Sequence, residues 1–177
     1  HVRESGFKND VGRHEYRNNS IINYAKAFER ITNSGGWVIR MGDSTMTELP
    51  KMERVIDYPF TKFKSDLMDI FLIKNCRIYL GCHSGIMDVA ILFQKPILIA
   101  NMFCWNLGYP VFENSRGIVQ RIYCHSKKRI LTVKEMFEES WCTEAWNGYV
   151  DNGKFTWHEN SPEDIEEAVV EYMDLLK

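Results

Sequence analysis

Short runs of mostly apolar residues alternate along the chain with segments in which apolar residues recur every three or four positions. The short runs are typical of β-strands. The clearest run, residues 97–100, is apolar throughout, as in a strand buried on both faces of a sheet. The pattern predicts further strands at 37–41 and 77–82 and a short strand within 46–58, while residues 1–3 read as the end of a strand.

The segments with helical spacing predict amphipathic helices. The last of them has the clearest start, because Ser161 can cap it, Pro162 suits its first position and acidic residues follow. The expected helices cover residues 20–32, 65–73, 86–93, 132–137 and 161–176. Residues 4–17 read as a loop, and residues 101–123 carry no clear pattern.

Strands that alternate with helices, and that have the composition of buried parallel strands, predict an α/β fold. We expect a Rossmann-like, doubly wound, mainly parallel sheet, formed by residues 1–177 as a single domain without internal repeats. Right-handed crossovers then place the strand-to-helix turns along one edge of the sheet, where ligands bind in such folds.

Composition narrows the range of functions. The 177 residues are 45% hydrophobic, 13% aromatic and 26% charged, which describes an ordinary globular domain and excludes a disordered chain. A formal charge of −2 gives no overall attraction to polyanions, so we expect no nucleic-acid partner. No stretch reaches the roughly 18 unbroken apolar residues of a membrane-spanning helix.

The five cysteines form an odd set without a C-x-x-C pair, so neither a disulfide framework nor a zinc site is expected. We expect a protein of a reducing compartment, the cytoplasm, with peripheral attachment at the inner face of a membrane left open. We also expect no metal and no cofactor. The G-x-G-x-x-G, Walker A and H-E-x-x-H motifs are absent, which disfavours dinucleotide oxidoreductases, P-loop NTPases and zinc proteases.

The segment His83-Ser84-Gly85 joins a predicted strand to a predicted helix. The first N–H groups of a helix and its positive dipole end bind anions such as phosphate. Ser84 adds a hydroxyl donor, and Gly85 allows a ligand to come close to the backbone. The alternative is that Ser84 only caps its helix, since serine is a preferred capping residue.

The same edge or its surroundings have four further charged candidates: Arg3, Arg40, Asp43 and Asp69. Arg3, at a strand end, can offer a bidentate fork to phosphate; the alternative is a surface ion pair with Glu4, Asp10 or another acid. Arg40 has the same two interpretations, and we favour a structural pair with Asp43. Asp69 lies among apolar helix positions, so its carboxylate must be exposed, paired or used.

Three segments together resemble the donor-binding half of GT-B-type glycosyltransferases, especially the fucosyltransferase-like group with an H-x-R motif. They are, in order, the segments 1–3, 64–72 and 81–85, which read HVR, KSDLMDIFL and GCHSG. The segment RMGD at 40–43 is further similar to a bacterial family of glycosyltransferase-like proteins associated with surface polysaccharide genes.

The resemblance implies one half of a GT-B fold and a role for each motif. Arg3 would grip the distal phosphate of the donor, as the catalytic residue, and His1 would lie near the base. Asp69 would read the edge of the base, and Asp43 could orient sugar hydroxyls. The turn of His83, Ser84 and Gly85 would hold the phosphates. A second arginine that many fucosyltransferases carry is replaced by Glu4, so the resemblance does not identify GDP-fucose as the donor, and the donor base and sugar stay open.

The implied reaction transfers a sugar from a nucleotide-diphosphate sugar to a glycan or lipid-linked acceptor. GT-B enzymes need two Rossmann-like halves, and this chain opens on His1 inside a strand-like segment. We therefore expect a C-terminal portion of a larger enzyme, inactive without its N-terminal domain. The alternatives are a non-catalytic Rossmann-like module, docking through the aromatic residues within 103–123, and a nucleotide-sugar epimerase.

Overall fold

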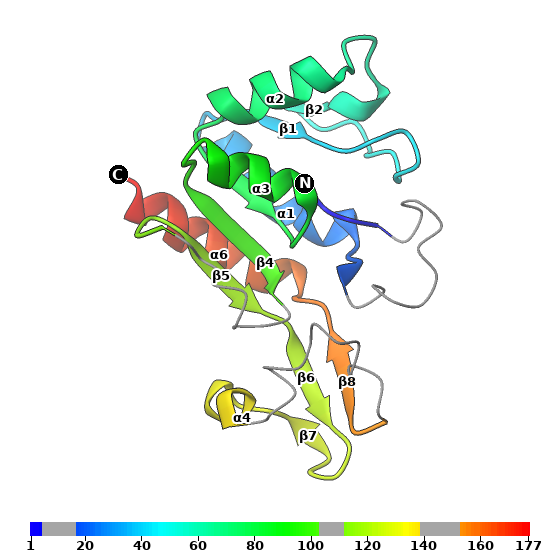
Figure 1. The fold of residues 1–177 in the computed structure, drawn as a ribbon, viewed down its shortest axis with the longest axis vertical. Coiled ribbons are helices and arrows are strands. Elements are labelled where there is room, and N and C mark those ends of the chain that lie inside the picture. Colours follow the sequence, from blue (N-terminus) through cyan, green and yellow to red (C-terminus); the bar gives the residue numbers. More distant parts are fainter. Residues whose placement is uncertain (5–16, 103–111, 139–152) are drawn as a thin grey trace.

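The computed structural model describes residues 1–4, 17–102, 112–138 and 153–177 (Figure 1). Residues 5–16 of the loop expected at 4–17, and most of the aromatic residues within 103–123, lie outside these ranges.

Parallel strands form the centre of the molecule. Strand β1 (Val38–Arg40) pairs with β2 (Val55–Asp57), and β3 (Tyr79–Gly81) pairs with β4 (Ile97–Met102), which pairs with β5 (Arg116–Val119). All six residues of β4 are buried, which confirms the expectation from its unbroken apolar run. The strands predicted at 37–41 and 77–82 are present but shorter.

Residues 1–3 lie beside β3. The His1 nitrogen donates a hydrogen bond to the Leu80 carbonyl (2.7 Å), and the His1 carbonyl accepts one from the Cys82 N–H (3.2 Å). These two bonds are the pattern of a parallel strand pair in which His1 lies opposite Gly81. A Cβ atom on Gly81 would lie 2.3 Å from the His1 carbonyl oxygen, so the close approach requires glycine.

Helices cover both faces of the β3–β4 pair (Figure 1). On one face, α1 (Ala25–Asn33) and α6 (Pro162–Leu175) pack with Leu98 and Ala100 of β4 in one hydrophobic cluster. On the other face, α2 (Asp66–Asn75) and α3 (Gly85–Leu92) pack with Ile97 and Ile99. The alternation of side chains along β4 therefore joins two separate clusters into one layered core.

Local sequence signals set the starts of two helices as predicted. The Ser65 side chain caps α2 by accepting a hydrogen bond from the Met68 N–H. At α6, Ser161 and Asp164 form a reciprocal capping box, and Pro162 follows Ser161. The helix expected at 20–32 instead opens with a 3₁₀ turn, Ile21–Tyr24, and continues as α1.

A small antiparallel sheet departs from the predicted pattern. Strand β6 (Arg121–Cys124) pairs with β7 (Arg129–Ile130) and with β8 (Phe155–His158), and α4 (Val133–Glu138) follows β7. Its own hydrophobic cluster includes Ile122, Leu131, Met136 and Phe155. The described chain is therefore mixed α/β with two small parallel sheets and one antiparallel sheet, rather than one mainly parallel sheet. Among the described residues, no helix has the length and apolar character needed to span a membrane.

Candidate functional site

The segment 1–3 and the turn that follows β3 lie together at one end of the strands. Besides the His1 contacts, the Arg3 N–H donates a hydrogen bond to the Cys82 Sγ atom at 3.2 Å. The turn that leads from Cys82 into α3 therefore runs beside the predicted H-x-R segment. Two of the three resembling motifs are brought side by side, although they are about 80 residues apart in the sequence.

The start of α3, at this turn, is not capped by the side chain of its N-cap residue. Ser84 is the N-cap residue of α3, but its side chain makes no capping hydrogen bond. Its Oγ atom lies 3.3 Å from the Tyr79 Oη atom instead. A Cβ atom on Gly85 would meet no atom within 4 Å, so the backbone there faces open space. The interpretation that the Ser84 side chain only caps its helix is therefore wrong.

His83 is held neutral beside this turn. Its side chain is buried, with 5% of its surface exposed. Burial, together with the nearby charge of Arg17, lowers the pKa of the His83 imidazole to about 4. The imidazole is consequently uncharged at neutral pH, and the positive charge at the turn comes from arginine.

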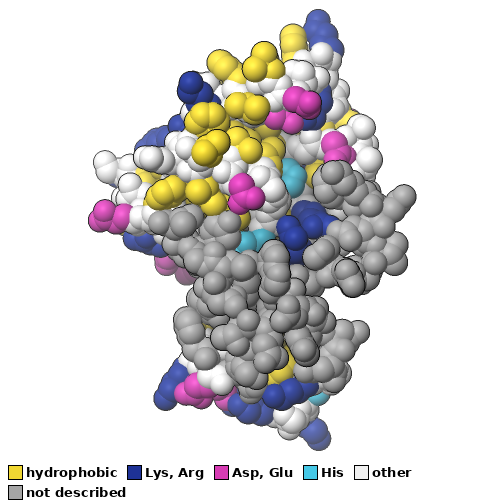
Figure 2. Space-filling view, in the orientation of Figure 1, with side chains coloured by type: hydrophobic (Ala, Val, Ile, Leu, Met, Phe, Trp, Pro, Cys, Tyr) yellow, Lys and Arg dark blue, Asp and Glu magenta, His cyan; other side chains and the backbone are white. Residues whose placement is uncertain are grey.

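Arg17 is a residue that the sequence analysis did not select. Its guanidinium Nη2 donates a hydrogen bond to the His83 carbonyl at 3.2 Å, which holds a cation against the turn. The Nε atom of Arg17 is buried and has no hydrogen-bond partner among the described residues. Figure 2 shows basic side chains beside histidine side chains midway along this face of the molecule. Arg17 and His83 are 66 positions apart, so no local pattern could have paired them.

Arg3 is buried rather than on the surface, with 7% of its surface exposed. Glu4, one of the acids expected as an alternative partner of Arg3, instead binds Arg40, and Asp10, the other named acid, lies outside the described residues. The Arg3 carbonyl accepts a hydrogen bond from the Asn19 N–H (2.8 Å), and the Asn19 side chain donates to the Arg17 carbonyl (2.8 Å). Asn19 thus ties the backbones of the two arginines together.

Arg40 forms a structural ion cluster, as favoured, but its partner is not Asp43. Its guanidinium donates to Asp57 (2.8 Å) and to Glu4 (2.9 Å), and its side chain is almost fully buried. Asp43 accepts two hydrogen bonds from Thr45, from the N–H (2.8 Å) and from the hydroxyl (2.5 Å), which form a local turn after β1. The carboxylate of Asp43 is engaged in this turn.

Asp69 is paired within its own region. Its carboxylate forms an ion pair with Lys64, whose ammonium also lies over the Tyr58 ring. The described contacts of Asp43 and Asp69 therefore do not join them to the Arg3 and Ser84 segments. Of the seven candidate residues, the structure brings together His1, Arg3, His83, Ser84 and Gly85.

The described residues hold no group of three or more His, Cys, Asp or Glu side chains that could bind a metal ion. The three cysteines within the described ranges, Cys76, Cys82 and Cys124, are thiols rather than disulfides. The chemistry available at the turn is thus that of guanidinium groups, a hydroxyl, backbone N–H groups and a neutral imidazole.

Comparisons with known proteins give no match: no family model, no curated protein and no solved structure is similar to this chain.

Proposed function

We propose that this chain is the donor-binding part of a GT-B-type glycosyltransferase and that the turn after β3 binds the diphosphate of a nucleotide sugar. The observation that carries the proposal is the open start of α3. Gly85 faces open space, the Ser84 hydroxyl does not cap the helix, and the Arg17 guanidinium is held at the turn. Helix N–H groups, a hydroxyl and a guanidinium are the donors that phosphate oxygens prefer.

The arrangement of the strands supports a Rossmann-like half. The ion pair between Glu4 and Arg40 brings the first segment near β1, and the His1 hydrogen bonds bring it beside β3. With residues 1–3 counted as a strand, the order becomes β2, β1, residues 1–3, β3, β4, β5. This is the strand order of a doubly wound dinucleotide-binding sheet, in which ligands bind beyond the carboxyl ends of the strands.

The proposed mechanism is electrostatic. Transfer breaks the bond between the sugar C1 and the diphosphate oxygen, so negative charge grows on the leaving diphosphate. Arg3, Arg17 and the amino end of α3 would stabilise that charge, as fixed donors do in many active sites. The base that accepts the proton of the acceptor hydroxyl would come from an N-terminal domain of the same protein. The protein itself would be located in the cytoplasm.

Asp69 and Asp43 would have less direct roles in the proposed function than the residues at the turn after β3. Asp69 would read the base edge only after Lys64 moves away or shares its carboxylate, because the two form an ion pair. Asp43 would reach sugar hydroxyls from the turn after β1, where it now binds Thr45. Neither is required for binding of the diphosphate.

The exposed apolar surface favours a second candidate, a non-catalytic docking module. Helices α2 and α3 carry large apolar side chains on their outer surface, among them Leu67, which is 79% exposed. Figure 2 shows hydrophobic side chains gathered on the upper part of the molecule, where these helices lie in Figure 1. A patch of this kind marks many interaction sites.

Calorimetric titration with GDP, UDP, CMP and dTDP separates the two candidates. The donor-binding proposal expects heat from at least one nucleotide. Arg17→Ala should weaken that binding roughly 10- to 100-fold, the scale of a hydrogen bond to a charged group. Lys51→Ala, an exposed lysine, is the matched control and should bind like the original chain. A folded chain that binds none of the four nucleotides contradicts the proposal.

A further inference from the structure

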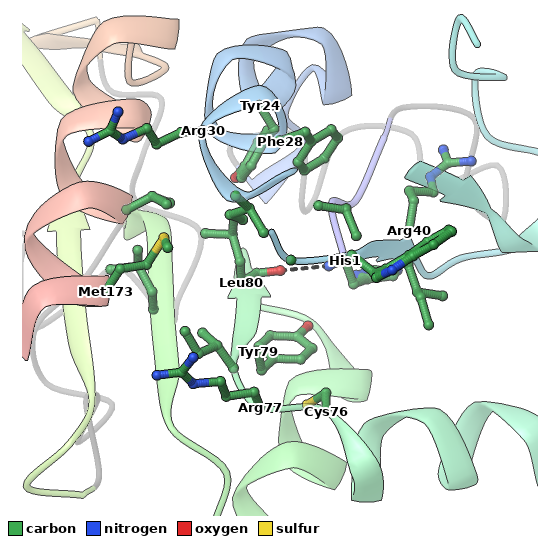
Figure 3. A pocket seen from close by; sticks show the side chains of 18 of the residues that line it. His1, Tyr24, Phe28, Arg30, Arg40, Cys76, Arg77, Tyr79, Leu80 and Met173 are labelled. Carbon is green, nitrogen blue, oxygen red and sulfur yellow. Dashed lines mark hydrogen bonds between the residues drawn. The ribbon is translucent and has the colours of Figure 1, made fainter. Parts of the chain in front are cut away.

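A cavity of about 730 Å³ lies between β1 and β3, away from the turn that follows β3. Its walls come from both layers of helices: Phe28 of α1 and Met173 of α6 on one side, and Leu72 and Cys76 of α2 on the other. Figure 3 shows Phe28 and Cys76 on opposite sides of the cavity, with the hydrogen bond between His1 and Leu80 between them.

The cavity lies where a further strand would fit between β1 and β3. Among the described residues, β1 pairs with β2 only, and β3 pairs with β4 on its other edge. The first segment meets β3 only from His1 onward, opposite Gly81. The cavity is lined by residues 77–80, ahead of that point, and by residues 36–41 of the β1 segment across from them. Two parallel strand edges thus face each other across a gap.

Apolar side chains that border the gap are less covered than those of β4. Ile39 of β1 is 39% exposed, and Ile78 and Leu80 are only partly buried, whereas every residue of β4 is buried. Ligands of parallel sheets bind beyond the carboxyl ends of the strands. This cavity instead lies beside the amino-terminal part of β3 and the residues that precede it, so its position is not that of a substrate site.

We propose that this groove holds a β-strand of about four apolar residues that runs parallel to β1 and β3 and continues directly into His1. Residues pair one to one in a parallel ladder, so the four positions ahead of His1 would lie opposite residues 77–80. A strand covered by helices on both faces is apolar throughout, as β4 is. The inference does not depend on the proposed function.

The surroundings of the His1 nitrogen agree with this occupant. Burial lowers the pKa of the His1 α-amino group to about 6, with the charge of Arg40 acting in the same direction. A peptide N–H at this position would carry no charge, and it would keep the hydrogen bond to the Leu80 carbonyl.

The test compares two extensions of the full chain, each fused directly to His1 behind the same short leader. One is Val-Ile-Val-Ile and the other is Ser-Asp-Ser-Asn. We expect the apolar extension to raise the melting temperature by about 5 °C or more over the polar one, as expected from burial of several aliphatic side chains. It should also slow amide hydrogen exchange in β1 and β3.

Two variants locate the effect. Ile39→Glu, which places a carboxylate at the groove, should abolish the gain from the apolar extension. Leu67→Glu, on the exposed surface of α2, should leave the gain unchanged. Equal melting temperatures for the two extensions, or a gain that survives Ile39→Glu, would overturn the proposal.

Discussion

Asn101 and Asn160 bind each other through reciprocal amide hydrogen bonds. The N–H of Asn101 donates to the Asn160 Oδ1 atom (2.7 Å), and the N–H of Asn160 donates to the Asn101 Oδ1 atom (2.6 Å). Both residues are buried, and the pair ties β4 to the segment that enters α6. The pair therefore fixes α6 against the parallel sheet.

Asn160→Ala should lower the free energy of unfolding by about 3 kcal/mol, because it leaves the Asn101 N–H and the Val119 carbonyl without their partner. Urea unfolding followed by circular dichroism measures the change. Asn75→Ala removes an exposed hydrogen bond from the Asn75 side-chain amide to the Phe71 carbonyl, at the end of α2, and should lower the free energy of unfolding by less than about 1 kcal/mol. Equal losses for the two variants would contradict this account.

Two glycines four positions apart should respond in opposite ways to alanine. Gly81→Ala places a Cβ atom 2.3 Å from the His1 carbonyl oxygen, so the first segment must move away from β3. We expect a loss of about 2 kcal/mol or more in the free energy of unfolding. Thermal and urea unfolding measure it.

Gly85→Ala has open space for its Cβ atom and lies in the first turn of α3. The stability should be unchanged or rise by up to about 1 kcal/mol, because alanine is the better helix former. Nucleotide affinity should nevertheless fall, since the new methyl group stands where the proposed phosphate approaches. Loss of stability in Gly85→Ala would contradict the open space at Gly85, and full stability in Gly81→Ala would contradict the close approach of His1 to Gly81.

His83 should make the stability depend on pH between about 4 and 6.5. Its folded-state pKa is lowered to about 4, so between these values the unfolded chain binds the proton more strongly. The contribution of neutral His83 is present above about pH 6.5 and is lost as the pH falls towards 4. The loss is about 3 kcal/mol at most. Urea unfolding at several pH values measures it, and His83→Gln should flatten the dependence. An equally steep profile in that variant would contradict the assignment.

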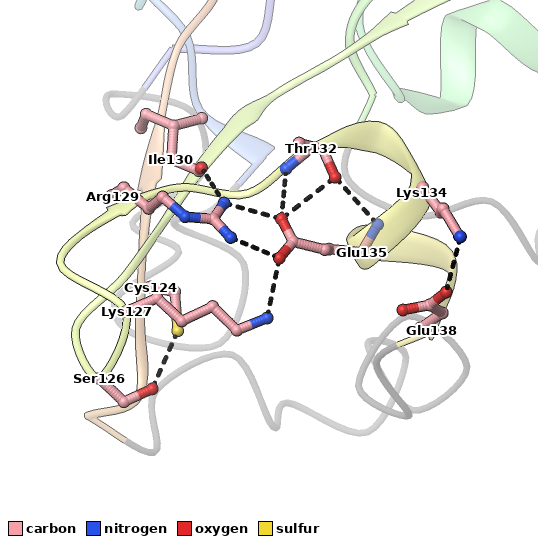
Figure 4. Close-up of polar contacts among 9 residues, drawn as sticks. All are labelled: Cys124, Ser126, Lys127, Arg129, Ile130, Thr132, Lys134, Glu135 and Glu138. Carbon is pink, nitrogen blue, oxygen red and sulfur yellow. Dashed lines mark hydrogen bonds and ion pairs between the residues drawn. The ribbon is translucent and has the colours of Figure 1, made fainter.

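Glu135 organises the polar contacts of the small antiparallel sheet (Figure 4). Its carboxylate accepts hydrogen bonds from Arg129 (2.6 and 2.8 Å), Lys127 (3.0 Å) and the Thr132 N–H (2.9 Å). The short basic run at 126–129 is therefore partly paired, through Lys127 and Arg129.

Arg129 is the main cause of a pKa of Glu135 well below its usual range. We expect Glu135 to stay ionised at pH 4, where an ordinary glutamate is about two-thirds protonated. Carboxyl NMR titration measures this directly. Arg129→Ala should move the pKa back towards its ordinary value, whereas Lys134→Ala, whose partner is Glu138, should not. An ordinary titration of Glu135 in the original chain would contradict the contacts.

Features that a few neighbouring residues determine could be predicted from the sequence. The unbroken apolar run of β4 and the capping residues of α2 and α6 are of this kind, and the structure confirms them. The same holds for the strand-to-helix turn that places Ser84 at the start of α3.

Features that depend on distant residues could not be predicted. Strand β8 pairs with β6 although 30 residues separate them, and both strands are short and partly exposed. Arg40 binds Asp57 across neighbouring strands rather than the nearer Asp43. Arg17 reaches His83 only because the folded chain returns to the turn. Local spacing carries no information on such pairs.

The central claim is that the start of α3 binds the diphosphate of a nucleotide. The most direct test records amide NMR spectra of the chain while the nucleoside diphosphates UDP, GDP and dTDP are added in turn. The claim predicts that, for at least one of them, the largest shifts fall on the N–H groups of Gly85 and Ile86 and on the Arg17 side chain. Saturable shifts centred on any other part of the chain, with these signals unmoved, would contradict it.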